Sequence, residues 1–435
     1  MPTARETAVE ALFRCERGGY SNLVLMSMLS SDGMDARDRA FCTALVYGTL
    51  SRKMTIDALL KRFSGRELSR LDTEVLQILR SGVYQIFWMD SVPARAAISE
   101  SVELCRRFRK SSASGFVNAV LRKCSSEEIG SVWSGIEDET ERLSLHYSMS
   151  ESLVRLLKEQ FGDGTESVLE AMFRRERMFI RVNILRADAD GVISNLQAEE
   201  VTATETEIPN CLMVVSGNPV GTGTLKSGLA RIQSLPAQYA AFAAHAVPGC
   251  RVLDMCAAPG GKTACLAQDM NDMGSVTSLD LNSNRLSLIE RLMKTQGISI
   301  VRTCQCDAAE YDDPEPFDVV LCDVPCSGYG EIQSKPELRY KDPDVSSELP
   351  DLQYRILCNG ARLTKPGGRI VYSTCTVLDR ENKDIIRRFL NEHEEFYLTL
   401  PDRIPEGALT EEDMVSFIPG EHGSEGFFVA VMGKM

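Results

Sequence analysis

In the stretch Val252-Leu253-Asp254-Met255-Cys256-Ala257-Ala258-Pro259-Gly260-Gly261-Lys262-Thr263, an apolar run is followed by a glycine pair and the start of a helix. A strand, a glycine turn and a helix start form the nucleotide-binding corner of an α/β fold. A phosphate-binding P-loop would need glycine at position 256, and a Gly-x-Gly-x-x-Gly fingerprint is absent. The stretch therefore predicts a loop that lets a ligand approach the backbone without cradling a pyrophosphate.

From about residue 233 onward, strand patterns alternate with helix patterns. The predicted elements cover residues 251–256, 263–270, 275–280, 283–296, 300–304, 317–322, 352–363, 369–373 and 379–390, with a closing strand over 426–431. Such alternation is typical of a doubly wound, mostly parallel sheet. We therefore predict a Rossmann-like α/β domain over residues 233–435.

The preceding residues predict a different architecture. Apolar residues recur at helical spacing over 3–17, 37–50, 55–63, 73–89, 94–109 and 114–123, which predicts an all-α domain over residues 1–125. Residues 126–149 are acidic and polar and are predicted to be a connector. Residues 150–232 mix helical and short alternating patterns, which predicts a small α+β unit. The fold class is thus multidomain, with an all-α, a small α+β and an α/β part.

Composition narrows the class of protein. The chain has 435 residues and a net charge of −14, but basic residues outnumber acidic ones over 1–125 and acidic ones prevail elsewhere. Its 14 Cys form no CxxC pair, and its 4 His leave little for a zinc site. No apolar run approaches the roughly 18 residues of a membrane span, and no signal core follows Met1. We expect a cytoplasmic monomer without a metal or membrane partner.

The basic first domain fits binding of a polyanion. Its basic residues cluster as Arg106, Arg107, Arg109 and Lys110, and again as Arg122 and Lys123. Either these residues contact RNA or they form a solvated helix face, and the sequence leaves both interpretations open.

Acidic residues follow successive predicted strands of the α/β part. Asp280 ends the second strand, where a carboxylate can bind both hydroxyls of a ribose, although it could instead cap the next helix. Asp307 follows the third strand, in a position to touch an adenine edge, and Asp323 follows the fourth. Acids around one site repel phosphates but suit a sulfonium cation. S-adenosylmethionine, a cationic nucleoside without phosphate, is the predicted cofactor. The residues predicted to bind it are Cys256, Ala257, Ala258, Pro259, Gly260, Gly261, Lys262, Asp280, Arg285, Asp307 and Asp323.

Two cysteines lie in short loops that each follow an apolar β-type run. Cys326 lies in Asp323-Val324-Pro325-Cys326-Ser327-Gly328, and Cys375 lies in Tyr372-Ser373-Thr374-Cys375-Thr376. A residue at the carboxyl end of a strand in an α/β protein points into the crevice where ligands bind. The pair suggests covalent chemistry with one nucleophile and one helper, and the alternative is two inert buried thiols.

These motifs resemble a known family. The stretch from Asp254 to Thr263, the Pro325-Cys326 loop and the Thr374-Cys375 loop are similar to the cofactor and cysteine motifs of RNA cytosine-5 methyltransferases. The first domain resembles the NusB antitermination factor, through Arg37-Asp38-Arg39-Ala40, Val46-Tyr47-Gly48-Thr49-Leu50, residues 92–102 and Phe116-Val117-Asn118-Ala119-Val120-Leu121-Arg122. This combination is similar to bacterial enzymes that methylate 16S ribosomal RNA.

The resemblance implies a division of labour among four residues. Cys375 would attack C6 of a cytosine, and C5 would then accept a methyl group from S-adenosylmethionine. Cys326 would help release the product. Asp323 would hydrogen-bond the base, and Lys262 would add positive charge near the thiolate. The cytosine would have to be single-stranded or flipped out of a helix.

Some positions depart from the family pattern. Gln333-Ser334-Lys335 stands where an Arg-rich segment is usual, Ser234-Leu235-Pro236 replaces part of a Gln-Asp-x-Ala-Ser motif, and Val324 replaces alanine. These departures affect the expected docking of RNA more than the reaction. Two other functions remain open at this point, the same chemistry on transfer RNA and a non-catalytic RNA-binding assembly factor.

Overall fold

The computed structural model describes residues 2–29, 33–174, 176–419 and 423–435. The chain forms two compact units. The first comprises Met1–Phe173 with Ser334–Pro343, and the second comprises Arg174–Gln333 with Asp344–Met435. Among the described residues, no helix is both long enough and apolar enough to cross a bilayer.

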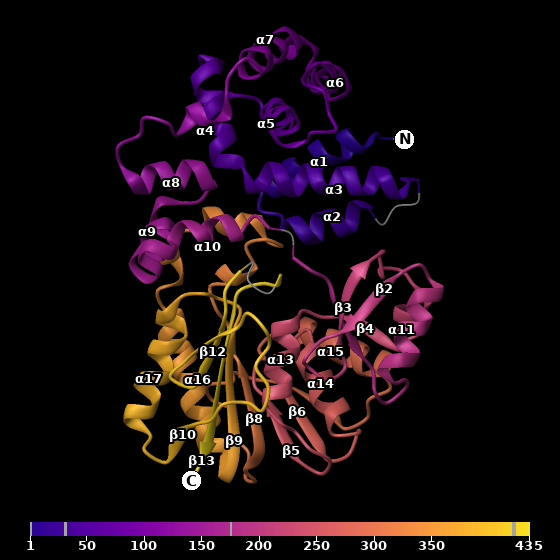
Figure 1. Ribbon diagram of the computed structural model, residues 1–435, viewed down its shortest axis with the longest axis vertical. Helices are drawn as coiled ribbons and strands as arrows, with labels where there is room; N and C mark the ends of the chain where they lie inside the picture. Colours follow the sequence, from indigo (N-terminus) through magenta and orange to yellow (C-terminus); the bar gives the residue numbers. More distant parts are fainter. Residues whose placement is uncertain (1, 30–32, 175, 420–422) are drawn as a thin grey trace. The chain divides into compact units, whose positions relative to one another are not determined.

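The first unit is helical, and the prediction of an all-α domain over residues 1–125 is confirmed. Its residues up to Phe173 are coloured indigo to magenta in Figure 1. Thr3 begins the first helix with a capping box, in which its side chain accepts from the Glu6 N–H and Glu6 accepts from the Thr3 N–H. Leu45 and Ile78 are among the helical residues with no exposed surface. The helices are α1 (Ala4–Glu16), α2 (Ser21–Leu29), α3 (Ala36–Ser51), α4 (Lys53–Ser64), α5 (Thr73–Trp88), α6 (Ala94–Arg107), α7 (Ser114–Cys124), α8 (Glu139–Tyr147), α9 (Glu151–Phe161) and α10 (Thr165–Ala171).

A short piece of the late sequence completes this helical unit. Within Ser334–Pro343, the 3-10 turn η6 (Pro336–Tyr340) carries Arg339, which is buried and donates to the carbonyl oxygen of Tyr147 at 3.1 Å. Its guanidinium carbon lies 3.9 Å from the centre of the Phe173 ring. Gln333-Ser334-Lys335, which departs from the family pattern, therefore directly precedes the turn that carries the buried Arg339.

The second unit contains a small antiparallel sheet in the order β2-β3-β1-β4. Its strands are β1 (Phe179–Val182), β2 (Thr202–Glu205), β3 (Cys211–Ser216) and β4 (Ala230–Ile232), with helices α11 (Ala189–Ala198) and α12 (Gly223–Lys226). Val192 and Leu196 of α11 pack with Ile180 of β1 and Leu212 of β3 in one apolar cluster. The predicted α+β character of this part is confirmed.

The larger sheet of the same unit has the order β11-β12-β13-β9-β8-β5-β6-β7, and β10 pairs with β13. Strands β5 to β9 are parallel, whereas β10 to β13 are antiparallel to their neighbours. Its strands are β5 (Arg251–Asp254), β6 (Ser275–Asp280), β7 (Val301–Gln305), β8 (Phe317–Asp323), β9 (Thr364–Thr374), β10 (Phe396–Leu398), β11 (Leu409–Glu411), β12 (Met414–Phe417) and β13 (Phe427–Lys434). Doubly wound topology with parallel central strands is thus confirmed.

Helices cover both faces of this sheet (Figure 1). Successive residues of a strand point to opposite faces, so Val252 and Leu253 of β5 enter two different cores. One core includes α13 (Leu235–Ala243), α14 (Gly261–Asp269) and α15 (Ser283–Gln296), and the other includes α16 (Leu349–Leu363) and α17 (Lys383–Glu392). This arrangement places the strand ends of β5, β6, β8 and β9 at one edge of the sheet.

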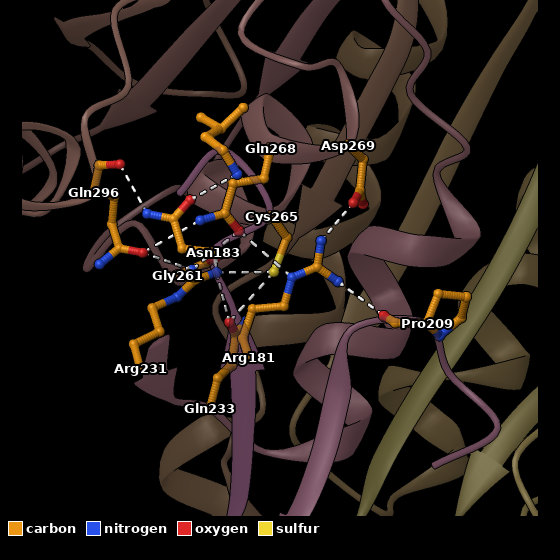
Figure 2. A network of polar contacts seen from close by, with 11 residues as sticks. Arg181, Asn183, Pro209, Arg231, Gln233, Gly261, Cys265, Gln268, Asp269 and Gln296 are labelled. Carbon is orange, nitrogen blue, oxygen red and sulfur yellow. Dashed lines mark hydrogen bonds and ion pairs between the residues drawn. The ribbon is translucent and has the colours of Figure 1, made fainter. Parts of the chain in front are cut away.

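A buried polar network joins the small sheet to α14 and α15 (Figure 2). Arg181 of β1 pairs with Asp269 and donates to the carbonyl oxygen of Pro209 at 3.3 Å. Arg231 of β4 donates to the carbonyl oxygen of Gly261 at 2.9 Å, at the first residue of α14. The small sheet therefore supports the helix that follows the glycine turn.

The structure adds elements that the sequence patterns did not reveal. Residues 126–149, predicted as a connector, contain helix α8. The acidic residues Glu139 and Glu141 form part of the first turn of this helix. Asp138 caps that turn by accepting from the Glu141 N–H at 2.8 Å, and negative charge is favoured at a helix N-terminus. Helix α2 was not predicted because the apolar residues of 23–26 are consecutive and hide the helical period. The domain boundaries at 125, 149 and 232 stay predictions.

Candidate active site

The glycine turn predicted to bind the cofactor lies between β5 and α14. Gly260 has a φ of 101° and precedes α14 as its N-cap. A Cβ at Gly260 would lie 3.2 Å from the Cα of Ile289, so a side chain there would be strained and crowded. The Ala257 N–H donates to the carbonyl oxygen of Leu279 at 2.8 Å, which holds the loop against β6.

Three carboxylates stand at the carboxyl ends of neighbouring parallel strands, Asp254 on β5, Asp280 on β6 and Asp323 on β8. Asp280 lies 3.3 Å from an Arg285 nitrogen, and Arg285 donates to the carbonyl oxygen of Ala258 at 2.8 Å. The structure thus brings together Asp280, Arg285 and the cofactor loop. The alternative that Asp280 caps the next helix is wrong, because Asn282 is the N-cap of α15.

Asp307 lies beyond the end of β7, as predicted. Its side chain accepts from the Ala309 N–H at 2.9 Å and closes a local turn. Cys306, directly before it, donates from its N–H to the carbonyl oxygen of Asp280 at 3.3 Å. Asp307 is therefore tied to the strand that carries Asp280, and its contact with an adenine stays a prediction.

Asp254 is a buried carboxyl group that the sequence did not single out. One of its oxygens accepts from the Thr263 hydroxyl at 2.7 Å, and the other has no hydrogen-bond partner among the described residues. Burial raises the pKa of Asp254 to about 7. An acid that is half neutral near pH 7, beneath the loop predicted to bind a cationic cofactor, can gain charge when a cation arrives.

We expect Asp254→Asn to remove a pH dependence of stability. Because an unfolded aspartate titrates near pH ~3.9, the folded protein holds a proton between that value and about pH 7 that the unfolded chain has lost. The free energy of unfolding then falls as pH rises, by about 1.4 kcal/mol per pH unit. Urea unfolding at about pH 5 and pH 6.5 measures this effect. Between these two pH values, the free energy of unfolding should fall by about 2 kcal/mol more in the wild type than in the variant. Equal declines would contradict this assignment.

The two cysteine loops meet at the end of β8 and β9. The sulfur atoms of Cys326 and Cys375 are 3.2 Å apart, and both residues are half-buried. Register explains the meeting, since Asp323 of β8 lies opposite Ser373 of β9 in a parallel pair. The Cys326 hydrogen bond and burial raise the pKa of the Cys375 thiol well above its ordinary value. Cys375 is therefore a neutral thiol before substrate binds.

Lys262 and Asp323 form an ion pair beside the cysteines. The Lys262 ammonium lies 2.7 Å from one Asp323 oxygen, and the Ser373 hydroxyl donates to the other at 2.8 Å. Burial disfavours the charged form of Lys262, but the Asp323 carboxylate outweighs it and raises the pKa of the ammonium. The ammonium also lies 5.2 Å from the centre of the Phe427 ring. The site thus holds a fixed positive charge whose field is largely offset by its partner.

The structure brings together the four residues predicted to be catalytic and places Glu331, which the sequence did not single out, beside them. Glu331 accepts a hydrogen bond from the Cys375 thiol at 3.3 Å. Its only sequence signal is its place shortly after Cys326, because a lone glutamate in a loop carries no pattern.

Three of the four residues in the first basic cluster, which comprises Arg106, Arg107, Arg109 and Lys110, pair with acids. Arg106 and Arg107 pair with Glu103, and Lys110 pairs with Asp72 at 2.7 Å. These contacts favour a solvated helix face over an RNA contact for this cluster.

A different basic surface of the first unit is hollowed. A concavity of about 670 Å³ is lined by Lys61, Gly65, Arg66, Glu67 and Arg70. All five residues are exposed, and Arg66 lies over the Phe116 ring. We name these five residues the basic hollow.

Family models match most of the chain. The model described as 16S rRNA methyltransferase RsmB/F matches residues 242–433, and that of the NusB family matches residues 2–126. The RsmF/B-like ferredoxin-like domain matches residues 150–221. The matched ranges cover all three architectures described above.

Individual relatives match over nearly the full length. The chain is 35% identical to "Probable ribosomal RNA small subunit methyltransferase B" of Bacillus subtilis, over 99% of each chain. It is 31% identical to "Ribosomal RNA small subunit methyltransferase B" of Xanthomonas campestris, over 92% of this chain and 90% of the relative. The crystal structure of PH0851 is similar with a TM-score of 0.84 and 28% identity, over 100% of this chain and 99% of that one. A methyltransferase homologue from Pyrococcus horikoshii covers 69% of this chain and 100% of its own, with a TM-score of 0.62 and 25% identity.

Proposed function

Because the chain belongs to the RsmB/F family of 16S rRNA methyltransferases, we propose that it methylates C5 of a cytosine in small-subunit ribosomal RNA through a covalent bond between Cys375 and C6. As a member of this family it is an S-adenosylmethionine-dependent RNA methyltransferase. The observation that supports the finer proposal is the 3.2 Å approach of the Cys326 and Cys375 sulfurs beside the Lys262–Asp323 pair.

The residues at the strand ends fit S-adenosylmethionine. The unpartnered oxygen of Asp254 and the carboxylates of Asp280 and Asp323 supply negative charge without a phosphate-binding nest. Asp280 would accept from the ribose hydroxyls, and the backbone of residues 256–261 would lie along the nucleoside. S-adenosylmethionine, when bound, supplies a methyl group activated by its sulfonium charge.

Cys375 would act as the nucleophile in this proposal. C5 of cytosine is a poor nucleophile, and addition of a thiolate at C6 gives C5 the electron density to take a methyl group. Asp323 already accepts from Lys262 and Ser373, and its remaining lone pairs can accept from the N4 amino group of the cytosine. The Lys262 ammonium would stabilise negative charge on sulfur and base as the bond forms.

Cys326 would serve the second half of the reaction. After methyl transfer, the C5 proton must leave and the bond between sulfur and C6 must break. Cys326 is 3.2 Å from the sulfur that must depart, so it can assist release directly or through a water.

Mapping of 5-methylcytosine tests the substrate assignment. Bisulfite sequencing of 16S ribosomal RNA should show one cytosine that loses methylation when the gene is deleted and regains it on complementation. Transfer RNA from the same cells is the control. If deletion changes the 5-methylcytosine map of transfer RNA but not that of 16S ribosomal RNA, transfer RNA is the substrate. If deletion changes neither map, the protein is better explained as a non-catalytic assembly factor.

We expect the basic hollow to contribute to RNA binding. Arg70→Ala should weaken binding of a 16S RNA fragment and reduce the slope of log K against log salt by about 0.9, as for one lost phosphate contact. Arg14→Ala is the matched control, because Arg14 is an exposed arginine of the same unit that pairs with Glu10. Affinity measured by filter binding across salt concentrations checks the prediction, and equal slopes for both variants would contradict it.

A further inference from the structure

The nucleophilic cysteine has a carboxylate neighbour. Glu331 ends the 3-10 turn η5 (Tyr329–Glu331), which follows the Cys326 loop. The Cys375 thiol donates to a Glu331 oxygen at 3.3 Å, within the range of a sulfur hydrogen bond. The thiol therefore has a proton acceptor in place before any substrate arrives.

Backbone contacts fix Glu331 at this position. The Gly330 N–H donates to the carbonyl oxygen of Cys375 at 2.9 Å, and the Gly426 N–H donates to the carbonyl oxygen of Gly330 at 2.9 Å. A Cβ at Gly330 would lie 1.9 Å from the Gly426 oxygen, so only glycine fits between the two neighbouring segments. The turn that carries Glu331 is thus locked to the residue that carries the thiol.

The chemistry of the site requires such an acceptor. Cys326 and burial hold the Cys375 thiol in its neutral form by raising its pKa. The nearby cation, Lys262, is bonded to Asp323 at 2.7 Å, which offsets much of its effect on the sulfur. A neutral thiol is a weak nucleophile, so its proton must leave as the sulfur attacks.

We propose that Glu331 is the general base that removes the proton of Cys375 as its sulfur adds to C6 of the cytosine. This inference rests on the proposed function. The S–H bond breaks, the proton passes to Glu331 Oε2, and the sulfur electron pair forms the bond to C6. When the product is released, the C5 proton leaves to solvent, the bond between sulfur and C6 breaks, and the departing sulfur recovers the proton held by Glu331. Each turnover returns both residues to their starting forms.

A passive role for Glu331 predicts the opposite effect of its removal. A negative charge beside a thiol disfavours the thiolate, so a merely repulsive Glu331 would slow the attack. In that case Glu331→Gln would make Cys375 more reactive at neutral pH. If Glu331 is the base, the same substitution makes the attack slower.

The experiment measures formation of the covalent adduct with RNA that contains 5-fluorocytidine, since fluorine at C5 cannot leave as a proton and the adduct persists. We expect Glu331→Gln to slow adduct formation at pH 7 by about 100-fold, and the deficit to narrow as pH rises and the thiol ionises unaided. Glu331→Asp keeps a carboxylate and should recover part of the rate. The affinity for S-adenosylmethionine should be unchanged in both variants.

Glu425→Gln is the matched control. Glu425 is another glutamate of the same unit, and its carboxyl group accepts from the Ser424 hydroxyl at 2.9 Å, not from a cysteine thiol. This variant should form adduct at the wild-type rate. Equal or faster adduct formation by Glu331→Gln would overturn the role of Glu331 while leaving Cys375 as nucleophile. Absence of an adduct in the wild type would overturn the proposed function itself.

Discussion

Replacing Cys375 with alanine should lower the rate of methyl transfer by about 10⁴-fold or more and abolish the covalent adduct with RNA. The thiol supplies the bond that makes C5 reactive, and a methyl side chain cannot replace it. The neighbouring sulfur of Cys326, 3.2 Å away, does not compensate if the two cysteines have different roles. Methyl transfer from labelled S-adenosylmethionine to a 16S RNA transcript measures the loss.

Replacing Cys326 with alanine should have a different consequence. Attack and methyl transfer would proceed, but release would be slow, so an adduct between Cys375 and RNA should accumulate. Denaturing electrophoresis detects it, and mass spectrometry locates the modified cysteine. Cys250→Ala, a change at another half-buried cysteine of the same unit, should behave as the wild type. If Cys326→Ala forms no adduct while Cys375→Ala does, the two roles are reversed.

Replacing Arg181 with methionine should destabilise the second unit by about 4 kcal/mol. Arg181 is 1% exposed, pairs with Asp269, and donates to Pro209 and to the Gln268 side chain. Methionine fills part of the volume but leaves a half-buried carboxylate and a carbonyl oxygen without their donor. The network in Figure 2 shows these partners converging on Arg181 from α14 and from the Pro209 loop.

Amide hydrogen exchange is the suitable measurement, because it resolves local stability within a chain of two units. Exchange in β1, β4 and α14 should become faster in Arg181→Met. Arg186→Met is the control, since Arg186 donates to the carbonyl oxygen of Ser227 from an exposed position, and it should change stability by at most about 0.5 kcal/mol. Equal protection in both variants would show that the network contributes little.

Several elements could be predicted because their determinants are local. Strand β6 and helix α15 have the predicted bounds, 275–280 and 283–296, because alternation of two and spacing of 3.6 are visible over a short window. Helix α8 was missed because its acidic first turn looks polar until Asp138 is seen to cap it. The antiparallel strands β11 and β12 are short and depend on pairing with β13, which no local pattern encodes.

The candidate site likewise combines residues that local sequence patterns predict with residues that only tertiary contacts bring together. The glycine turn and Asp280 could be predicted, because a strand, a turn and a terminal acid are consecutive in sequence. The acceptor role of Glu331 toward Cys375 could not, because the two residues are 44 positions apart and meet only where Gly330 packs against Gly426. The place of Arg339 could not be predicted either, since nothing in the neighbouring sequence indicates that its segment belongs to the helical unit.

By itself, the sequence determined the order of architectures, the strand, glycine turn and helix start predicted to bind the cofactor, and the two cysteine loops that resemble an RNA cytosine-5 methyltransferase. These follow from periodicity, turn chemistry and motif spacing, all of which are properties of neighbouring residues. Only the tertiary structure decided that the Cys326 and Cys375 sulfurs lie 3.2 Å apart and that Glu331 receives the Cys375 hydrogen bond. The physical reason is the register of β8 on β9, which aligns loops 49 positions apart through backbone hydrogen bonds that no local pattern specifies.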